Sequence, residues 1–437
     1  MNWSPKEPDV LELSRFFKAC NPTKTLAFED EVDRQYYIDF APVRGSDLIR
    51  ELQRTINLSG SDPTCQLFTG HIGCGKSTEL LRLKADLEAQ KYHTVYFESS
   101  QDLDLADIDV TDILLAIARR VSASLEAIGI RLRVNYFTAL FQDIADLVQT
   151  PIDIDVEADL SVGIGKITAK TRESPKLRDQ IRQYLEPRTS SILEVVNRDL
   201  FGRAKQELQK KQQKDLVVIV DNLDRVDSSL TPSGKTQPVY LFIDRGEQLK
   251  RLNCHVVYTI PMVLVFSNYM NPLINRFGTD PRVLPMVPVK LSDGRDCDMG
   301  IALLRQMVLA RAFPAENPIK RLESVTQIFD QADTLDRLCR ISGGHVRNLL
   351  VLLHRCILQE NPPISRTCLE RIITQRRNEL RLAITEDEWQ LLLQVAQQKR
   401  DVRGEEEYQL LLRSMFVFEY RYESKLWFDV NPILMEP

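Results

Sequence analysis

The spacing of apolar residues predicts alternating helices and strands over the first 290 residues. Leu48, Leu52 and Ile56 recur every four positions, which is the spacing of a helix with one buried face. A second helix is expected over residues 76–89. Short apolar runs predict strands over residues 65–69, 93–98, 216–220, 255–260 and 283–289. Because strands alternate with helices, we expect an α/β fold with a parallel sheet.

The rest of the chain has a different pattern, which is helical from about residue 296 to 381. Residues 385–437 then predict two helices and two aromatic-rich strands around the turn Glu423-Ser424-Lys425. Helices followed by a terminal hairpin are typical of a winged helix. The expected domains are an N-terminal extension over 1–40, an α/β domain over 41–290, an all-α lid domain over 291–381 and a winged-helix domain over 382–437.

Residues 101–214 are expected to form an insertion in the α/β domain. Helical spacing continues to about residue 150, and the alternation from Ile152 to Ile164 then predicts a β-hairpin. We expect this hairpin to pack on its own domain, and contact with another subunit or a membrane is the alternative. A helical stretch follows, with 11 basic and 6 acidic residues from Arg172 to Lys214.

A glycine-rich segment between the first strand and the helix over 76–89 matches the pattern G-x-x-x-x-G-K-[ST] in full. Its glycines let backbone N–H groups face phosphate oxygens, and the helix N-terminus adds partial positive charge. Lys76 is expected to reach the terminal phosphates and Ser77 to bind Mg²⁺. The expected nucleotide-binding residues are Gly70, His71, Ile72, Gly73, Cys74, Gly75, Lys76, Ser77 and Thr78.

The strand over residues 216–220 leads into a carboxylate, Asp221. A carboxylate at the carboxyl end of a parallel strand is placed to hold Mg²⁺ in a phosphate-loop site, so we predict Ser77 and Asp221 as metal ligands. Asn222 comes next, and an amide cannot accept a proton from the attacking water. Asp224 or another carboxylate would have to act as the general base. We therefore predict hydrolysis that is slow or depends on Asp224.

The overall composition excludes several other classes of protein. The formal net charge is -5 and the pI is about 5.8, so no global positive field favours nucleic acid or an anionic membrane. The eight cysteines include no C-x-x-C pair, which argues against a disulfide framework or a zinc site and fits a reducing cytoplasm. The longest apolar stretch, around Val256–Phe266, is too short to cross a bilayer. We expect a cytoplasmic protein.

Together the motifs resemble those of AAA+ ATPases, in particular the origin-recognition clade and the related STAND ATPases, which carry a helical lid and a winged helix. The resemblance covers about residues 40–437 apart from the insertion. The sequence D-N-L-D-R at residues 221–225 is also similar to that of KAP-type ATPases, which usually have Glu where Asn222 stands. The matching segments are Gly70–Ser77, Asp221–Asp224, Thr259–Pro261, Ile274–Phe277 and Ser342–Arg347.

The resemblance implies roles for further residues. Thr259 would be a polar sensor beside the γ-phosphate, and Arg347 would be the lid arginine that reads the nucleotide. Arg276 would be an arginine finger offered to a neighbouring subunit, with Arg282 as its rival. Each residue also has an ordinary interpretation, because Thr259 suits a buried strand and the arginines suit a solvated surface.

The expected function is an ATP-dependent and Mg²⁺-dependent conformational or assembly switch with slow turnover. The resemblance extends this expectation to bacterial defence or signalling, and it also supplies the preference for adenine. One alternative is a DNA-acting AAA+ protein, such as an initiator or a transposition regulator. The other is a nucleotide-binding scaffold that does not hydrolyse ATP.

Charge in the last domain bears on the DNA alternative. Residues 385–437 contain 6 basic and 11 acidic residues, which opposes contact with phosphates. This domain is therefore expected to contact protein or to be autoinhibitory, in a homo-oligomer or with another protein partner. DNA contact would better suit the basic stretch from Arg178 to Lys214, or the arginines Arg371, Arg376, Arg377 and Arg381.

Overall fold

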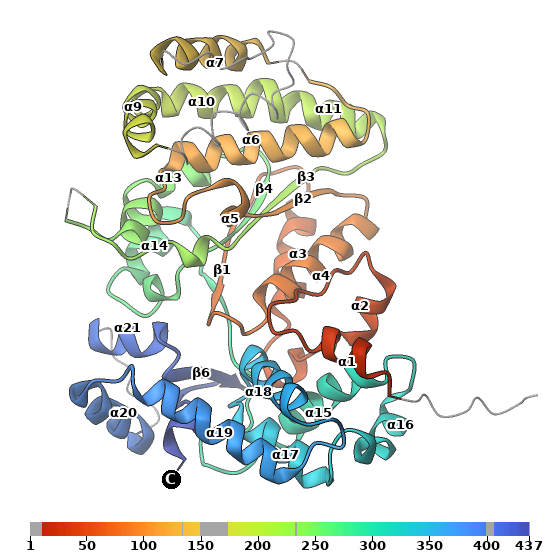
Figure 1. Ribbon diagram of the computed structural model, residues 1–437. Helices are drawn as coiled ribbons and strands as arrows, with labels where there is room; N and C mark the ends of the chain where they lie inside the picture. Colours follow the sequence, from red (N-terminus) through yellow and green to blue (C-terminus); the bar gives the residue numbers. More distant parts are fainter. Residues whose placement is uncertain (1–10, 133, 149–173, 232–233, 399–405, 437) are drawn as a thin grey trace, which may run out of the picture. The chain divides into compact units, whose positions relative to one another are not determined.

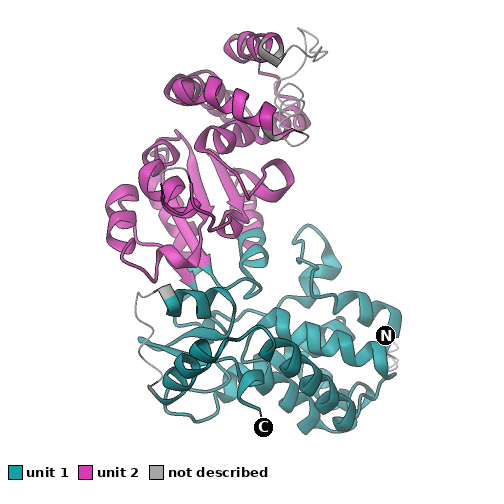
Figure 2. Ribbon diagram, turned by 60° about the vertical axis from the view of Figure 1, so that its left-hand side comes forward, with its two compact units in different colours: residues 1–48, 70–81, 284–437 teal, residues 49–69, 82–283 magenta. Residues whose placement is uncertain are grey.

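The computed structural model describes residues 11–132, 134–148, 174–231, 234–398 and 406–436. Two compact units are coloured separately in Figure 2. Unit 1 comprises residues 1–48, 70–81 and 284–437, and unit 2 comprises residues 49–69 and 82–283. The hairpin that the sequence predicts over Ile152–Ile164 lies outside the described residues.

Unit 2 is built on a five-stranded sheet with the order β2-β3-β4-β1-β5 (Figure 1). The pairs β1–β4, β3–β4 and β2–β3 are all parallel. The predicted α/β fold with a parallel sheet is therefore confirmed. The strands are β1 (Cys65–Gly70), β2 (His93–Glu98), β3 (Leu216–Asp221), β4 (His255–Thr259) and β5 (Arg282–Leu284).

The prediction for the last strand was wrong in its extent, since β5 ends at Leu284 and not near residue 289. The apolar run beyond it is buried by other partners. Within unit 1, the backbone N–H of Met286 donates to the carbonyl of Glu419 at 3.0 Å, and that of Val287 donates to the carbonyl of Gly344 at 3.4 Å. These residues are thus apolar because they pack between the terminal hairpin and a helical turn.

The strand register places three strand ends at one edge of the sheet. Phe68 of β1 lies opposite Thr259 of β4, and Val220 of β3 lies opposite Tyr258. Since the strands are parallel, their carboxyl ends meet at the same edge, which is where open α/β sheets bind ligands. Every residue of β3 is buried, as expected for a parallel strand covered on both faces.

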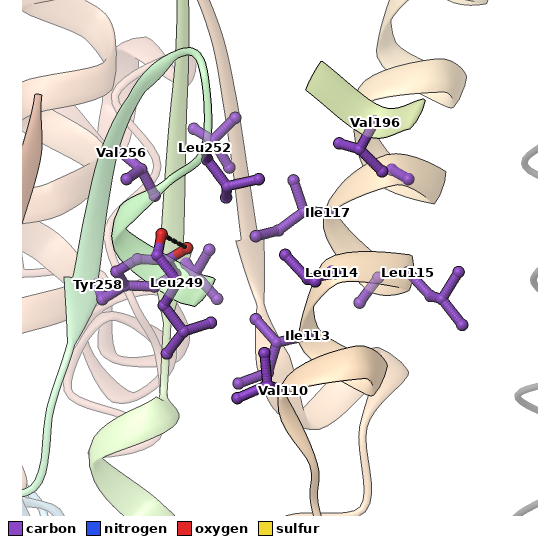
Figure 3. Close-up of a cluster of buried hydrophobic side chains, with 14 of the residues drawn as sticks. Val110, Ile113, Leu114, Leu115, Ile117, Val196, Leu249, Leu252, Val256 and Tyr258 are labelled. Atoms are coloured by element: carbon purple, nitrogen blue, oxygen red, sulfur yellow. Dashed lines mark hydrogen bonds between the residues drawn. The ribbon is translucent and has the colours of Figure 1, made fainter. Parts of the chain in front are cut away.

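Helices cover the sheet of unit 2, and α6 packs against both β2 and β3. Figure 3 shows Val110, Ile113 and Ile117 on the side of α6 that faces the strands, whereas Leu115 points away. The helices are α3 (Leu48–Ser59), α4 (Lys76–Ala89), α5 (Ser99–Asp102), α6 (Val110–Ala127), α7 (Asn135–Val148), α9 (Pro175–Leu185), α10 (Thr189–Val195), α11 (Gly202–Lys210), α12 (Gln237–Val239), α13 (Gly246–Lys250) and α14 (Met270–Phe277). The first turns of α3 and α4 contain residues of unit 1.

Unit 1 is mostly helical and has its own core, to which Phe16 of the N-terminal segment contributes. The chain ends in an antiparallel hairpin, as predicted. The elements are α1 (Leu13–Ala19), α2 (Glu31–Tyr36), α15 (Asp298–Ala312), α16 (Pro318–Glu323), α17 (Ala332–Ile341), α18 (Val346–Gln359), α19 (Arg366–Arg381), α20 (Glu386–Gln398), α21 (Glu406–Arg413), β6 (Val417–Tyr422) and β7 (Lys425–Val430).

Candidate functional site

The phosphate loop follows β1 and leads into α4, which begins at Lys76 as predicted. The Lys76 ammonium is buried and donates to the carbonyl of Gly70 at 2.8 Å and to that of His71 at 2.9 Å. A lysine folded over the loop in this way holds its charge beside the backbone N–H groups that bind phosphate. The loop thus has the local geometry that the sequence pattern requires.

Gly73 occupies a position that no other residue fits. Its φ is +87°, a region that L residues rarely adopt. An added Cβ would lie 2.8 Å from Cβ of Arg347 and 2.8 Å from Cε1 of His345. The turn before α18 therefore approaches the loop backbone so closely that glycine is needed at this position.

Two residues at the N-terminal end of α18, its N-cap His345 and its second residue Arg347, bond to loop carbonyls. The Arg347 backbone N–H donates to Gly73 at 3.2 Å. The ring of His345 accepts from the Asn348 N–H through Nδ1 at 2.9 Å, so its proton is on Nε2, which donates to the Ile72 carbonyl at 2.8 Å. Burial, with further help from the Arg347 charge, lowers the pKa of His345 to about 4 and keeps the ring neutral. His345 was not among the sequence-predicted site residues.

The terminal hairpin binds the other side of the loop through His71. Nε2 of His71 accepts from the Glu419 backbone N–H at 3.0 Å. Phe418 stacks on the His345 ring and meets the His71 ring edge to face. Burial, together with repulsion from the His345 ring when it is protonated and from the Lys76 charge, lowers the pKa of His71 to about 3. The loop is therefore fastened both to the helical region and to the hairpin.

Arg44 is a further residue that the sequence pattern did not reveal. It is almost fully buried, donates to the Cys74 carbonyl at 2.7 Å and lies 3.8 Å from the Glu79 carboxylate. Tyr37 donates to the same carboxylate at 3.2 Å. No local pattern marks an isolated arginine before a helix as a loop ligand, because its partners lie at least 30 residues away in the sequence.

At the sheet edge of unit 2, Asp221 is fully buried and is held by neutral donors. Its Oδ2 accepts from the Tyr96 hydroxyl at 2.8 Å and its Oδ1 accepts from the Asn222 N–H at 2.7 Å. Asn222 is also buried and has a φ of +64°. Asparagine tolerates this left-handed conformation better than other residues with a Cβ. The local backbone therefore gives a physical reason for Asn at this position.

Thr259 ties the end of β4 to the turn after β3. Its hydroxyl accepts from the Leu223 N–H at 3.0 Å and donates to the Val220 carbonyl at 3.4 Å. Asp224 lies in that turn, a short helix over Leu223–Arg225, and is half-buried. The sensor role of Thr259 and the base role of Asp224 stay predictions.

In a comparison with known families, residues 46–231 match the KAP family P-loop domain. The matched range includes the phosphate loop and Asp221. The predicted resemblance to a phosphate-loop ATPase is thus confirmed for this part of the chain, while Thr259, Arg276 and Arg347 lie outside the matched range. No curated protein sequence matches the chain significantly.

The chain was also compared with solved structures, and three of the matches are as follows. The Walker-type ATPase paby2304 of Pyrococcus abyssi is 12% identical over 95% of this chain and 98% of that chain, with a TM-score of 0.45. The ORC2 protein of Aeropyrum pernix, in ADPNP–ADP complexes, is 14% identical over 93% and 95%, with a TM-score of 0.39. Cdc6p of Pyrobaculum aerophilum is 13% identical over 92% and 94%, with a TM-score of 0.36.

The residues that match the KAP P-loop domain include oxygen ligands that fit Mg²⁺. The carboxylate of Asp221, which accepts from Tyr96 and from the Asn222 N–H, is one such oxygen donor. Ser77 stands in the first turn of α4 with its side chain half-buried. A hydroxyl and a carboxylate are ligands that Mg²⁺ prefers. The pairing of Ser77 with Asp221 stays a prediction.

Both candidate arginine fingers make contacts within unit 2. Arg276 is half-buried and its Nε donates to the carbonyl of Ile243 at 2.9 Å. Arg282 forms an ion pair with Glu51 at 3.2 Å. These contacts do not distinguish the two candidates, and the finger role of either residue stays a prediction.

The basic stretch that follows residue 172 is largely engaged in ion pairs of its own unit. Arg178 pairs with Asp104 at 2.8 Å, Arg182 with Asp107 at 2.5 Å, and Lys205 with Asp215 at 3.2 Å. Such pairs reduce the positive charge that this surface offers to a nucleic acid. Among the helices in the described residues, none is long and apolar enough to cross a membrane.

Proposed function

We propose that the chain binds ATP and Mg²⁺ on its phosphate loop and acts as a nucleotide-dependent conformational or assembly switch that hydrolyses ATP slowly. The observation that carries this proposal is the set of bonds to the loop carbonyls. The carbonyl of Ile72 accepts from the His345 ring, and the carbonyl of Gly73 accepts from the Arg347 N–H. The carbonyl of Cys74 accepts from the Arg44 guanidinium. The groups that would sense the nucleotide thus bond directly to the backbone that binds it.

Peptide geometry explains how occupancy would be transmitted. A carbonyl and the next N–H belong to one rigid peptide plane. The Ile72 carbonyl therefore shares a plane with the Gly73 N–H, and the Gly73 carbonyl shares a plane with the Cys74 N–H. When an N–H turns toward a phosphate oxygen, its carbonyl turns as well, so the bonds to His345 and Arg347 change with nucleotide occupancy.

The terminal hairpin supplies a second connection. The carbonyl of His71 accepts from Lys76, while its ring accepts from the Glu419 N–H. A terminal phosphate attracts the Lys76 ammonium away from the carbonyl, which frees His71 to shift relative to the hairpin. This connection fits the prediction that the last domain is autoinhibitory or contacts protein, and its acidic composition favours protein over DNA.

A ligand shifts a conformational equilibrium only through its differential affinity for the two states. Arg347→Ala keeps the backbone N–H that bonds to Gly73 but removes the guanidinium that the resemblance assigns to nucleotide sensing, so it should weaken the response to ATP more than ATP binding itself. The test compares size-exclusion chromatography with light scattering, and hydrogen exchange across Val346–Gln359, with no nucleotide, with ADP and with a non-hydrolysable ATP analogue. Arg355→Ala is the matched control, because Arg355 is on the same helix and pairs with Glu379.

The expected result is a nucleotide-dependent change in mass or exchange in the parent and in Arg355→Ala, and a reduced change in Arg347→Ala. If Arg347→Ala shows the same nucleotide-dependent change as the parent, Arg347 is not the lid sensor. If the parent protein binds ATP without any change in mass or in hydrogen exchange, the switch hypothesis is ruled out and the non-hydrolysing scaffold remains as the alternative. Salt-sensitive, ATP-dependent retention of DNA in a filter-binding assay would support the DNA-acting alternative.

A further inference from the structure

The pairing of β2 with β3 places a second carboxylate beside Asp221. Glu98 is the last residue of β2 and lies opposite Asp221 in the parallel register. Residues in register on neighbouring strands have side chains on the same face, and every second residue of a strand shares that face. Tyr96 therefore belongs to the same face as Glu98, and its hydroxyl bond to Asp221 agrees with this arrangement.

The carboxylate of Glu98 is half-buried, and it has no hydrogen-bond or ion-pair partner within the part of the chain that the structure describes. It precedes α5, but its side chain makes no capping bond there. Asp221, by contrast, is held by Tyr96 and the Asn222 N–H. Of the two carboxylates that end neighbouring strands at this edge, Glu98 is thus the one available for a reaction.

The backbone also favours Glu98 over the residue after Asp221. Asn222 is buried in a left-handed conformation and carries an amide, which cannot accept a proton. Glu98 lies one strand away, in extended conformation at the N-terminus of α5, with a φ of −86°. A glutamate has no backbone strain at that position. The two side chains that a hydrolytic edge needs, one metal ligand and one base, are therefore present on adjacent strands.

We propose that Glu98 is the general base of ATP hydrolysis, a role that rests on the proposed ATP site. Glu98 accepts a proton from a water molecule as the oxygen of that water attacks the γ-phosphorus. The bond from the γ-phosphorus to the bridging oxygen breaks, ADP leaves, and the proton passes from Glu98 to solvent after phosphate forms. Tyr96 acts as a positioning residue, because its hydroxyl fixes the carboxylate of Asp221.

The test is single-turnover hydrolysis of labelled ATP together with calorimetry of MgATP binding. Glu98→Gln keeps the size of the side chain and a polar group that can form hydrogen bonds, but the amide cannot act as a base. The hydrolysis rate should fall about 10²-fold to 10⁴-fold, the usual contribution of a general base. ATP affinity should stay within about twofold, which also verifies that the variant folds.

Asp224→Asn tests the alternative general base, since the sequence predicts Asp224 for the same role. If Glu98→Gln hydrolyses ATP like the parent, the Glu98 assignment is overturned, and loss of activity in Asp224→Asn then assigns the base to Asp224. A parent that binds ATP without turnover also overturns this assignment but leaves the switch. A parent that does not bind ATP overturns the proposed function itself.

Discussion

The phosphate loop and the edge of β3 are both buried and polar, but they are held in different ways. Asp221 is fixed by its own strand, by the neighbouring N–H of Asn222 and by Tyr96 on the paired strand. The loop is held by side chains and backbone groups from distant segments, namely Arg44, His345 and Glu419. Strand pairing gives a rigid edge, whereas separate hydrogen bonds give a loop whose contacts can be exchanged.

Because of this difference, the two regions are suited to different functions. A metal ligand and a base need fixed geometry, which a paired sheet edge supplies. A sensor needs bonds whose formation depends on the ligand, and each loop bond involves one peptide plane that can turn. Variants of the loop should therefore affect binding and its coupling to conformation, while variants of the edge should affect turnover.

Apart from the loss of turnover expected in Glu98→Gln, the largest effect is expected from Lys76→Ala. The Lys76 ammonium forms charge-assisted bonds, which contribute about 1.5 to 3 kcal/mol, so MgATP affinity should fall about tenfold to hundredfold. Isothermal titration calorimetry measures this change. Lys84→Ala is the control, since Lys84 is on the same helix and pairs with Glu88. Equal ATP affinity in Lys76→Ala and the parent would refute the nucleotide site.

The loop contacts should also make unit 1 sensitive to acid. Burial lowers the folded-state pKa of His71 to about 3 and of His345 to about 4, from an ordinary value of 6.5. Each ring thus contributes stability that is present above pH 6.5 and is lost as the pH falls toward the folded-state pKa. The loss is about 1.4 kcal/mol per ring for each pH unit over this range.

Guanidinium unfolding followed by the fluorescence of Trp389 and Trp427 measures this dependence between pH 7 and pH 5. His71→Gln keeps an acceptor for the Glu419 N–H but does not titrate. Its free energy of unfolding should therefore depend on pH about half as steeply, after subtraction of the contributions common to both proteins, namely those of the carboxylates and of His93, His255 and His354, whose pKa values burial also lowers. Identical slopes for the parent and His71→Gln would mean that these rings do not control the acid response.

A smaller effect is expected from a methyl group added to the loop. In Gly73→Ala the new Cβ meets Arg347 and His345, whereas in Gly75→Ala nothing lies within 4 Å. Both glycines have positive φ, so backbone strain is common to the two variants. Thermal unfolding without nucleotide should show Gly73→Ala less stable than Gly75→Ala by about 1.5 kcal/mol. Equal stability would mean that the turn before α18 does not press on the loop.

The sequence predicted the parts of the site that depend on neighbouring residues. The strand before the loop, the helix from Lys76 and the strand leading to Asp221 all follow from local periodicity and a complete motif. Arg44, His345 and Glu419 could not be predicted this way, because each meets the loop only through the tertiary fold. Glu98 needed the register of β2 with β3, which periodicity does not determine.

The smallest predicted effect tests why Asn follows Asp221. Because Asn222 has a φ of +64°, Asn222→Glu should lose about 1 kcal/mol of stability, the cost of a left-handed conformation for an ordinary residue. Asn222→Gly should stay within about 0.5 kcal/mol of the parent, because glycine adopts this φ freely. Differential scanning calorimetry compares the two. Since Glu98 is expected to supply the base, Asn222→Glu should also leave the single-turnover rate unchanged. A rate gain above about tenfold in Asn222→Glu would show instead that the edge lacks a base and that the backbone conformation is not what selects asparagine.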